Sequence, residues 1–235
     1  MNHNVIAIDT STNIISLCIA KYDDDSENTQ IIAGTELPTQ LQHDISLIEG
    51  FRNLCTSANI TTHQCDAIIL GVGPGSFTGL RVSFAFAKAY AFTQNIPIIG
   101  ISMFECTQDD VDITCIFAPC TKTRYFYTIA QKNTDPLQPV CANVETIVAE
   151  ISATIPLHSQ IALLGAVEDE QINSAIHRIS QNSTRLSISE ALLSKGIKKL
   201  VSGDHLPIDA TPNYMASPIT DRQGVKKRPK FKDTR

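Results

Sequence analysis

The sequence predicts an α/β fold, and three observations support this prediction. The first is a series of short strand-like runs joined by tight turns at the start of the chain. The second is an apolar run at residues 67–70 that leads through a glycine-rich loop into a long helix-like segment. The third is a further group of strand-like and helix-like segments after residue 112. With 235 residues, 43% of them hydrophobic, the chain can bury a full core, as one large domain or two small ones.

The chain is expected to open with three strands, at residues 5–12, 14–21 and 30–37. Because their connections are short, these strands should pair as an antiparallel meander. The last two are separated by an acidic run at residues 23–28. Three adjacent carboxylates repel one another and stay solvated, so we interpret this run as a turn and not as a metal site.

A helix is expected over residues 40–58, beginning at a capping box formed by Thr39 and Gln42. Its apolar residues form two stripes, which indicates that the helix is contacted on two sides. His43 lies in the first turn, and the residue four positions later is Leu47. The helix therefore lacks the pair of histidines that would hold a metal ion on one face.

Residues 71–81, GVGPGSFTGLR, join the apolar strand to a helix expected over residues 77–93. Glycine tolerates positive φ and close backbone approach, and a serine at the helix start can cap it. A loop at a helix N-terminus can bind an anion, but this spacing matches neither the Walker nor the dinucleotide-binding pattern. An anion site and an ordinary strand-to-helix turn both remain open. The residues singled out in this glycine loop are Gly73, Gly75, Ser76 and Gly79.

The second helix, roughly 25 Å long at 1.5 Å per residue, is apolar nearly all round. Arg81 and Lys88 are its only charged residues. Its small residues recur every four positions and form a ridge: Gly79, Ser83, Ala87 and Ala91. A helix that is apolar on every side must be covered on every side, either by its own chain or by another protein. The residues expected to contact a partner protein are Leu41, Ile45, Ile48, Leu80, Ser83, Phe84, Ala87 and Ala91.

Composition changes after residue 104, where a cluster of aspartates marks a boundary. Further strands are expected at residues 113–118, 125–130 and 161–164, and helices at 144–153, 168–179 and 189–195, the last closed by Gly196. We therefore expect an N-terminal lobe at 1–104, a C-terminal lobe at 105–215 and a flexible basic tail at 216–235.

Charge is distributed unevenly along the chain. Residues 222–235 carry a net charge of +6, from seven basic residues and Asp233, and the remainder carries −11 because the whole chain has −5. Such a tail can contact RNA, contact an acidic protein surface or remain solvated.

The seven cysteines are scattered and odd in number, which favours reduced thiols in the cytoplasm over a disulfide framework. Cys55, His63 and Cys65 do not have the spacing of a common zinc site, so no metal site is expected in this chain. The start of the sequence does not read as a signal peptide, and no apolar run reaches the about 18 residues of a membrane span.

Three segments occur in one order: AIDTST at residues 7–12, GPGSFTGLR at 73–81 and PIIGIS at 97–102. Together they resemble the bacterial TsaB (YeaZ) family. The resemblance covers the first 105 residues well and the remainder weakly, through Tyr127 and residues 212–214. It implies the two-lobed actin/Hsp70/sugar-kinase-like (ASKHA) fold, with a mixed sheet and helices in each lobe.

The resemblance also implies a role in making N6-threonylcarbamoyladenosine at position 37 of tRNAs that read codons beginning with A. In that family's pathway, threonine, bicarbonate and ATP give threonylcarbamoyl-adenylate. TsaD, a homologous partner that holds the metal, transfers the threonylcarbamoyl group to the adenine N6, and the ATPase TsaE joins the complex. The chain alone is accordingly expected to bind no cofactor, because ATP and the metal ion belong to partner subunits. It is expected to pair with TsaD through its two N-terminal-lobe helices and to form a homodimer when alone.

The residues themselves agree with a non-catalytic subunit. Asp9, Thr10, Ser11 and Thr12 stand where actin-like ATPases carry Asp-x-Gly-Thr, and Ser11 replaces the glycine that lets bare backbone reach phosphate. We interpret these residues as a vestigial phosphate loop and expect no catalytic residue. The alternative is an enzyme in its own right, an actin-like ATPase or a metallopeptidase-like protein. Residues 120–127 depart from the family, because two acidic residues are lost and a lysine replaces the usual arginine.

Overall fold

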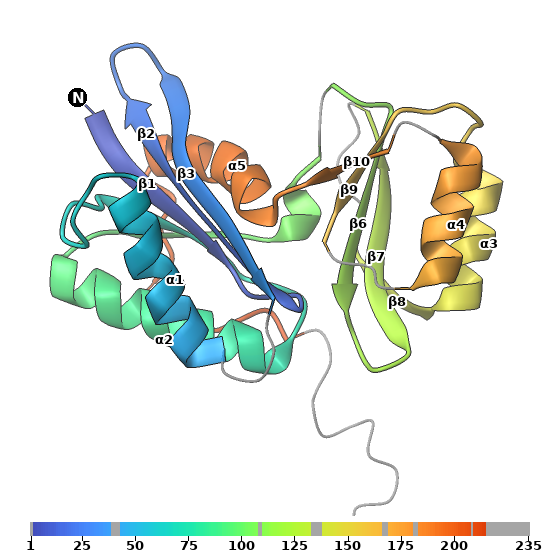
Figure 1. The fold of residues 1–235 in the computed structure, drawn as a ribbon, viewed down its shortest axis with the longest axis horizontal. Coiled ribbons are helices and arrows are strands. Elements are labelled where there is room, and N and C mark those ends of the chain that lie inside the picture. The colour runs from blue at the N-terminus through green and yellow to red at the C-terminus, as the bar shows by residue number, and fades with distance from the viewer. Residues whose placement is uncertain are drawn as a thin grey trace, which may run out of the picture.

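The computed structural model contains two five-stranded sheets, each flanked by helices (Figure 1). It describes residues 2–38, 43–107, 110–132, 138–165, 169–180, 183–207 and 209–214, with the side chains of residues 43–45 excepted. The first sheet has the strand order β3-β2-β1-β4-β5 and the second the order β10-β9-β6-β7-β8. The two-lobed α/β fold expected from the sequence is confirmed.

The first sheet combines an antiparallel meander with two parallel strands. Its strands are β1 (Asn2–Asp9), β2 (Ile14–Asp23), β3 (Asn28–Pro38), β4 (Ala67–Gly71) and β5 (Ile98–Ile101). β1 pairs with β2 antiparallel, with Asp9 opposite Ser16, and β4 and β5 are added in parallel. The expected meander is therefore confirmed.

Alternate residues of this sheet face two different sets of helices. Ile6 and Ile8 of β1 belong to the core beneath α1 (His43–Ser57) and α2 (Phe77–Gln94). Val5 and Ala7, their neighbours in the strand, belong to a second core beneath α5 (Ile188–Ser202). Because neighbouring residues of a strand point to opposite faces, both faces of the sheet are apolar and both are covered by helices.

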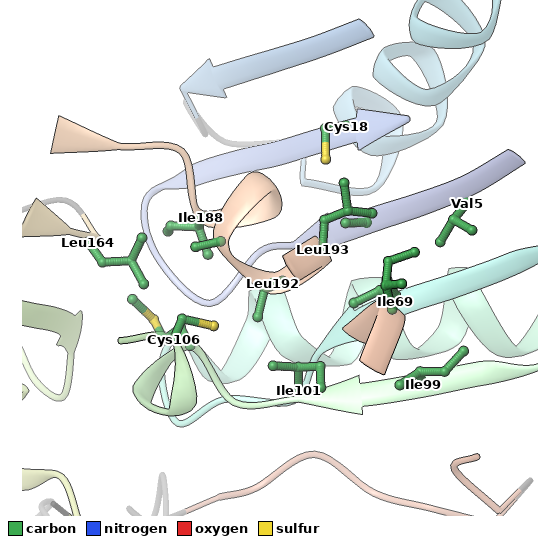
Figure 2. Close-up of a cluster of buried hydrophobic side chains, with 14 of the residues drawn as sticks. Val5, Cys18, Ile69, Ile99, Ile101, Cys106, Leu164, Ile188, Leu192 and Leu193 are labelled. Atoms are coloured by element: carbon green, nitrogen blue, oxygen red, sulfur yellow. The ribbon is translucent and has the colours of Figure 1, made fainter. Parts of the chain in front are cut away.

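The position of α5 differs from the sequence-based expectation. The helix was expected in the C-terminal lobe, but it packs on the first sheet, and Figure 2 shows Leu192 and Leu193 beside that sheet's Ile69. Gly196 lies inside the helix and does not close it. A Cβ at this position would lie 2.5 Å from the Ile69 side chain. The helix ends at Gly203, whose φ of 76° is left-handed. Close packing against a distant strand therefore explains this glycine.

The second sheet carries two helices on one face (Figure 1). Its elements, preceded by a short 3-10 helix at Met103–Glu105, are β6 (Ile113–Pro119), β7 (Arg124–Gln131), β8 (Val140–Asn143), α3 (Val144–Thr154), β9 (Ile161–Leu164), α4 (Glu170–Ile179) and β10 (Ser183–Leu186). Strands β8 and β10 were not expected from the sequence. Both are four-residue edge strands, too short and too exposed to show an apolar alternation.

One disulfide corrects the expectation that every cysteine is reduced. Cys120, after β6, is bonded to Cys141 in β8, which lies 21 residues later. The sequence could not show this because β8, the strand that brings the two together, was not recognised. The other five cysteines are free and buried, and burial raises the pKa of Cys18 and of Cys115 to about 12.

The chain returns to the first lobe with α5 and remains there. We call residues 204–207 and 209–214 the C-terminal strap; it runs from the end of α5 to the start of α2. Within the described ranges, no helix has the length and apolar character needed to cross a bilayer.

Candidate functional site

An apolar groove lies between α1 and α2 on the outer side of the first lobe. It has a volume of about 730 Å³. Leu47 and Ile48 of α1 line it together with residues from one side of α2: Phe77, Thr78, Arg81, Val82, Ala85, Phe86, Ala89, Tyr90 and Thr93. Ala85 and Ala89 are exposed small residues, so the surface is hollow where larger side chains would fill it.

The two helices are held together at this groove by three aromatic rings. Phe51 of α1 meets the edges of Phe86 and Tyr90 of α2, with ring centroids 5.3 Å and 5.1 Å apart. Edge-to-face pairs of this kind contribute about 0.5–1.5 kcal/mol beyond their buried area. Ile48, which lines the groove, is 50% exposed. The groove is therefore a preformed apolar surface with apolar side chains left in water.

The α2 residues expected to contact a partner lie on the buried side of the helix. Leu80, Ser83, Phe84, Ala87 and Ala91 were expected to contact a partner, but each is at most 5% exposed within the protein's own core. The expectation is corrected for these residues. They are buried because the ridge of small residues lets α2 approach its own sheet and hairpin. The groove lies on the opposite side, at Ala85 and Ala89.

Of the expected contact residues in α1, only Ile48 has a described side chain. Ile48 is exposed and lines the groove. Leu41 and the expected capping box at Thr39 and Gln42 lie outside the described residues, as does the side chain of Ile45.

The glycine loop binds the protein's own first hairpin. Thr10 Oγ1 donates a hydrogen bond to the Gly79 carbonyl oxygen at 2.8 Å, and the Ser76 N–H donates to the Ser11 carbonyl oxygen at 2.7 Å. A Cβ at Gly79 would lie 1.9 Å from the Thr10 carbonyl oxygen, and one at Gly75 would lie 2.2 Å from that of Ser11. The glycines are thus required for backbone-to-backbone packing.

Two further features of the loop support this interpretation. Gly73 has a φ of +92°, which only glycine adopts readily, and its carbonyl oxygen accepts a hydrogen bond from Ser102 Oγ at 2.7 Å. Ser76 caps α2 as expected, since its side chain accepts a hydrogen bond from the Gly79 N–H. Of the two interpretations, the structure supports the strand-to-helix turn.

The vestigial phosphate loop is enclosed. Asp9, Thr10, Ser11 and Thr12 are each at most 1% exposed. Asp9 Oδ1 accepts hydrogen bonds from the Ser11 N–H and hydroxyl, whereas Oδ2 has no partner among the described residues. Burial raises the pKa of Asp9 to about 6, against the lowering effect of the Ser11 hydrogen bonds. The glycine loop packs directly on this hairpin and all four residues are buried, so the hairpin offers no exposed backbone to a phosphate.

Of the three possible metal ligands, Cys55 and Cys65 meet, whereas His63 bonds elsewhere. His63 is exposed and hydrogen-bonded to Gln94, whereas Cys55 and Cys65 are buried. The thiol of Cys55 contacts that of Cys65, and this hydrogen bond together with burial holds the pKa of Cys55 well above its usual range. Across the described ranges, no three of the side chains His, Cys, Asp and Glu are grouped as metal ligands would be.

The segment that departs from the family is tied to the second sheet. Arg124 donates a hydrogen bond to the Cys141 carbonyl oxygen at 2.6 Å, and the Tyr127 hydroxyl bonds to Glu150. The disulfide at Cys120 lies at the start of this segment. This disulfide could not be predicted from the sequence, because neither cysteine lies in a recognised pairing motif.

Comparison with known proteins relates mainly the first lobe to one group. Residues 37–114 match the family model of TsaD, tRNA N6-adenosine threonylcarbamoyltransferase. The "tRNA threonylcarbamoyladenosine biosynthesis protein TsaB" of Haemophilus influenzae is 34% identical over 101 residues, 43% of this chain and 40% of that protein. The protein of the same name from Buchnera aphidicola is 28% identical over 102 residues, 43% and 45% of the two chains. The matched part of this chain thus spans less than half the length of these relatives.

Solved structures extend the similarity to the whole fold. YeaZ from Pseudomonas aeruginosa has a TM-score of 0.61 at 18% identity, and a Pseudomonas aeruginosa protein described as similar to peptidase YeaZ has a TM-score of 0.62 at 19% identity. Each match covers 91% of this chain and 100% of the other. The resemblance to the TsaB (YeaZ) family is therefore confirmed, in sequence over the N-terminal lobe and in fold over nearly the whole chain.

Proposed function

We propose that this protein is a non-catalytic subunit that supports a TsaD homologue in forming N6-threonylcarbamoyladenosine at position 37 of tRNAs reading codons that begin with A. Two comparisons support the proposal: the similarity to proteins named for threonylcarbamoyladenosine biosynthesis, and the match to the TsaD family model. The cytoplasm is the location that this function requires.

The observation that carries the proposal is the apolar groove between α1 and α2. Covering Ile48, which is 50% exposed, would remove the rest of a large apolar side chain from water, at about half of the 1.5–3 kcal/mol for burying a fully exposed one. The groove is hollow at Ala85 and Ala89, so a helix of another protein can approach closely there. A partner helix is therefore a fitting occupant.

The partner is inferred from the span of the family match. Residues 37–114 contain both groove helices, so a TsaD protein should carry a related helix pair. Two related pairs can meet about a pseudo-two-fold axis, each filling the other's groove, as in an isologous contact. The same geometry would let two copies of this chain pair as a homodimer when TsaD is absent.

We assign the chemistry to the other subunits. TsaD transfers the threonylcarbamoyl group from threonylcarbamoyl-adenylate to the adenine N6, and ATP and the metal ion are held by TsaD and the ATPase TsaE. The enclosed hairpin at Asp9–Thr12 supports this division, because its residues are buried and the glycine loop packs on its backbone. The contribution of this chain is to dock and support TsaD.

The test is co-purification with the TsaD homologue of the same organism, followed by a tRNA modification assay. Ala89→Glu places a charge in the groove and should abolish co-elution and modification while leaving the monomer folded. Ala149→Glu, at an exposed alanine of α3 on the other lobe, is the matched control and should change neither. Equal co-elution of the two variants would overturn the assignment of the groove.

The rival function, an ATPase or metallopeptidase-like enzyme in its own right, has a separate test. Calorimetry of the isolated chain with ATP and magnesium should show no binding at micromolar concentrations. Micromolar affinity would favour the rival, because it would require the glycine loop to leave the hairpin.

A further inference from the structure

The disulfide between Cys120 and Cys141 spans one edge of the second sheet. Cys120 follows β6, and Cys141 lies in β8, where it pairs opposite Phe126 of β7. Because β7 lies between β6 and β8, the bond crosses over β7 (Figure 1). Both cysteines pack against the core that Phe126 shares with the first lobe. The bond therefore secures β8 on the face of the sheet that meets the first lobe.

Strand β8 has few other attachments. It has four residues, of which Val140 and Asn143 are exposed, and as the last strand of its sheet it pairs with β7 alone among the described strands. Arg124 adds one side-chain hydrogen bond, from its guanidinium to the Cys141 carbonyl oxygen at 2.6 Å. A pair of short strands is marginally stable by itself in water. The covalent bond is therefore a major part of what holds β8 in place.

Cys120 and Cys141 are the two cysteines that solvent can reach. Both are half-buried, whereas the five free cysteines are buried. A small thiol can therefore approach the disulfide without unfolding the protein. Disulfides exposed to solvent are generally the labile ones, whereas structural disulfides resist reduction by the glutathione pool.

The chain around the bond is basic. Residues 113–143 contain three basic residues and one acidic residue. Lys122 and Arg124 come two and four positions after Cys120, and the Cys120 N–H donates a hydrogen bond to the Arg124 carbonyl oxygen at 3.0 Å, which closes the turn between β6 and β7. Nearby cations stabilise a thiolate, the form in which a cysteine leaves a disulfide. These two side chains therefore favour opening of the bond.

We propose that this disulfide is a redox switch that a small thiol opens and that controls whether β8 covers the edge of β7. The thiolate of one glutathione attacks a sulfur of the bond, forms a mixed disulfide and releases the other cysteine as a thiolate. A second glutathione attacks the mixed disulfide, so that both cysteines become thiols and one oxidised glutathione is released. The two electrons and two protons that the protein gains come from the two glutathione molecules. The inference goes beyond the proposed function, which contributes only the cytoplasm, a compartment where disulfides are usually transient or redox-sensing.

Reduction removes the constraint that keeps β8 on β7. In the oxidised protein Cys141 cannot move away from Cys120, so a break in the ladder between β7 and β8 closes again. After reduction the two residues are joined only through the chain between them, which spans 21 positions. Opening of β8 then leaves the outer N–H and C=O groups of β7 without their ladder, as a free sheet edge that an extended segment can pair with.

The first test measures reduction of the folded, full-length protein. The purified oxidised protein is incubated with an excess of reduced over oxidised glutathione, free thiols are alkylated, and each cysteine is assigned by peptide mass spectrometry. We expect Cys120 and Cys141 to be alkylated, while the five buried thiols react only after denaturation. A bond that survives until denaturant is added would identify a structural disulfide and overturn the proposal.

A charge reversal tests the role of the nearby cations. Lys122→Glu should make the bond harder to open, so that half-reduction needs about threefold more reducing glutathione mixtures or beyond. Lys132→Glu is the matched control, because it makes the same change at an exposed lysine beyond the far end of β7. It should leave the half-reduction point unchanged. Equal shifts in the two variants would overturn the role assigned to the cations beside the bond.

Hydrogen exchange tests the release of β8. The amides of residues 140–143 and of their partners at 124–127 should exchange about tenfold faster, or more, in the reduced protein than in the oxidised protein. The ladder between β6 and β9 is the internal control and should exchange equally in both states. The double variant Cys120→Ser with Cys141→Ser should match the reduced protein with or without glutathione. Unchanged exchange at residues 140–143 after complete reduction would overturn the proposal. These experiments need neither TsaD nor tRNA, so their failure is distinguishable from failure of the proposed function.

Discussion

Thr10 Oγ1 donates a hydrogen bond to the carbonyl oxygen of Gly79, 2.8 Å away, and so joins the first hairpin to the first turn of α2. The contact is buried, and its partners lie 69 residues apart in the chain. The glycine loop lies close to the hairpin at Gly71, Gly75 and Gly79. An added Cβ would lie closest to a backbone oxygen at Gly75 and Gly79, and closest to the Asp9 carboxylate at Gly71. The most conspicuous motif of the sequence therefore serves to pack two loops together.

This packing predicts that Gly79→Ala is strongly destabilising. The new Cβ would lie 1.9 Å from the Thr10 carbonyl oxygen, and backbone cannot move aside as a flexible side chain can. We expect the free energy of unfolding to fall by about 3 kcal/mol or more in urea titrations. Gly34→Ala is the matched control, because its nearest neighbour would be 3.6 Å from the Cβ. Similar urea midpoints for the two variants would contradict this account of the loop.

Two alanines of α2 should respond in opposite ways to the same change. Ala87 is fully buried, so Ala87→Glu places a charge in the core and should unfold or severely destabilise the protein. Ala89 is exposed in the groove, so Ala89→Glu should leave the melting temperature within a few degrees and remove only partner binding. Thermal denaturation and size-exclusion chromatography with and without TsaD measure both effects. A folded Ala87→Glu variant that no longer bound TsaD would restore the small-residue ridge as the contact face.

Asp9 should make stability depend on pH. Burial raises its pKa in the folded state to about 6, above the ordinary value of 3.8. Between those values the folded state binds a proton that the unfolded state does not, so this contribution to stability is greatest below pH 3.8 and is lost as the pH rises through 6. Asp9→Asn removes the titration. The stability of Asp9→Asn relative to wild type should therefore be greater at pH 7 than at pH 4, by about 3 kcal/mol. Parallel pH profiles of the two proteins in urea unfolding would refute the assignment.

The disulfide between Cys120 and Cys141 should stabilise the second lobe. Closing a loop of 21 residues restricts the unfolded chain, which corresponds to about 3 kcal/mol in the chain-entropy model. The double variant Cys120→Ser with Cys141→Ser should therefore melt at a lower temperature than the oxidised wild type. A reducing agent should lower the melting temperature of wild type and leave that of the variant unchanged. Equal effects of the reducing agent on both proteins would point to a different source of stability.

Much of the fold could be predicted locally. The strand-like runs of β1 and β2, the glycine loop after β4 and the apolar length of α2 each reflect short-range patterns, and the structure confirms each element. The edge strands β8 and β10 could not be predicted, because each has only four residues and shows no apolar alternation. Gly196 was misread as a helix end, since the reason for it is Ile69, which lies far away in sequence.

The candidate site was predicted only in outline. Two apolar helices pointed to an unusual surface, and the structure places a groove between them. Which side of α2 is exposed could not be predicted, because Ala87 and Ala89 are the same residue type in an evenly apolar sequence. The assignment depends on where the hairpin and the sheet lie against the helix.

The amino-acid sequence by itself determined the class of fold, the strand–glycine loop–helix unit, the family resemblance and the charge of the tail. These features depend on residue type and short-range periodicity, which the chain carries in any conformation. Only the tertiary structure decided that α5 covers the first sheet, that the ridge of α2 is internal and that Tyr214 ends beside Phe77. Each of these is a contact between residues distant in sequence, and its free energy exists only when the whole chain brings both partners together.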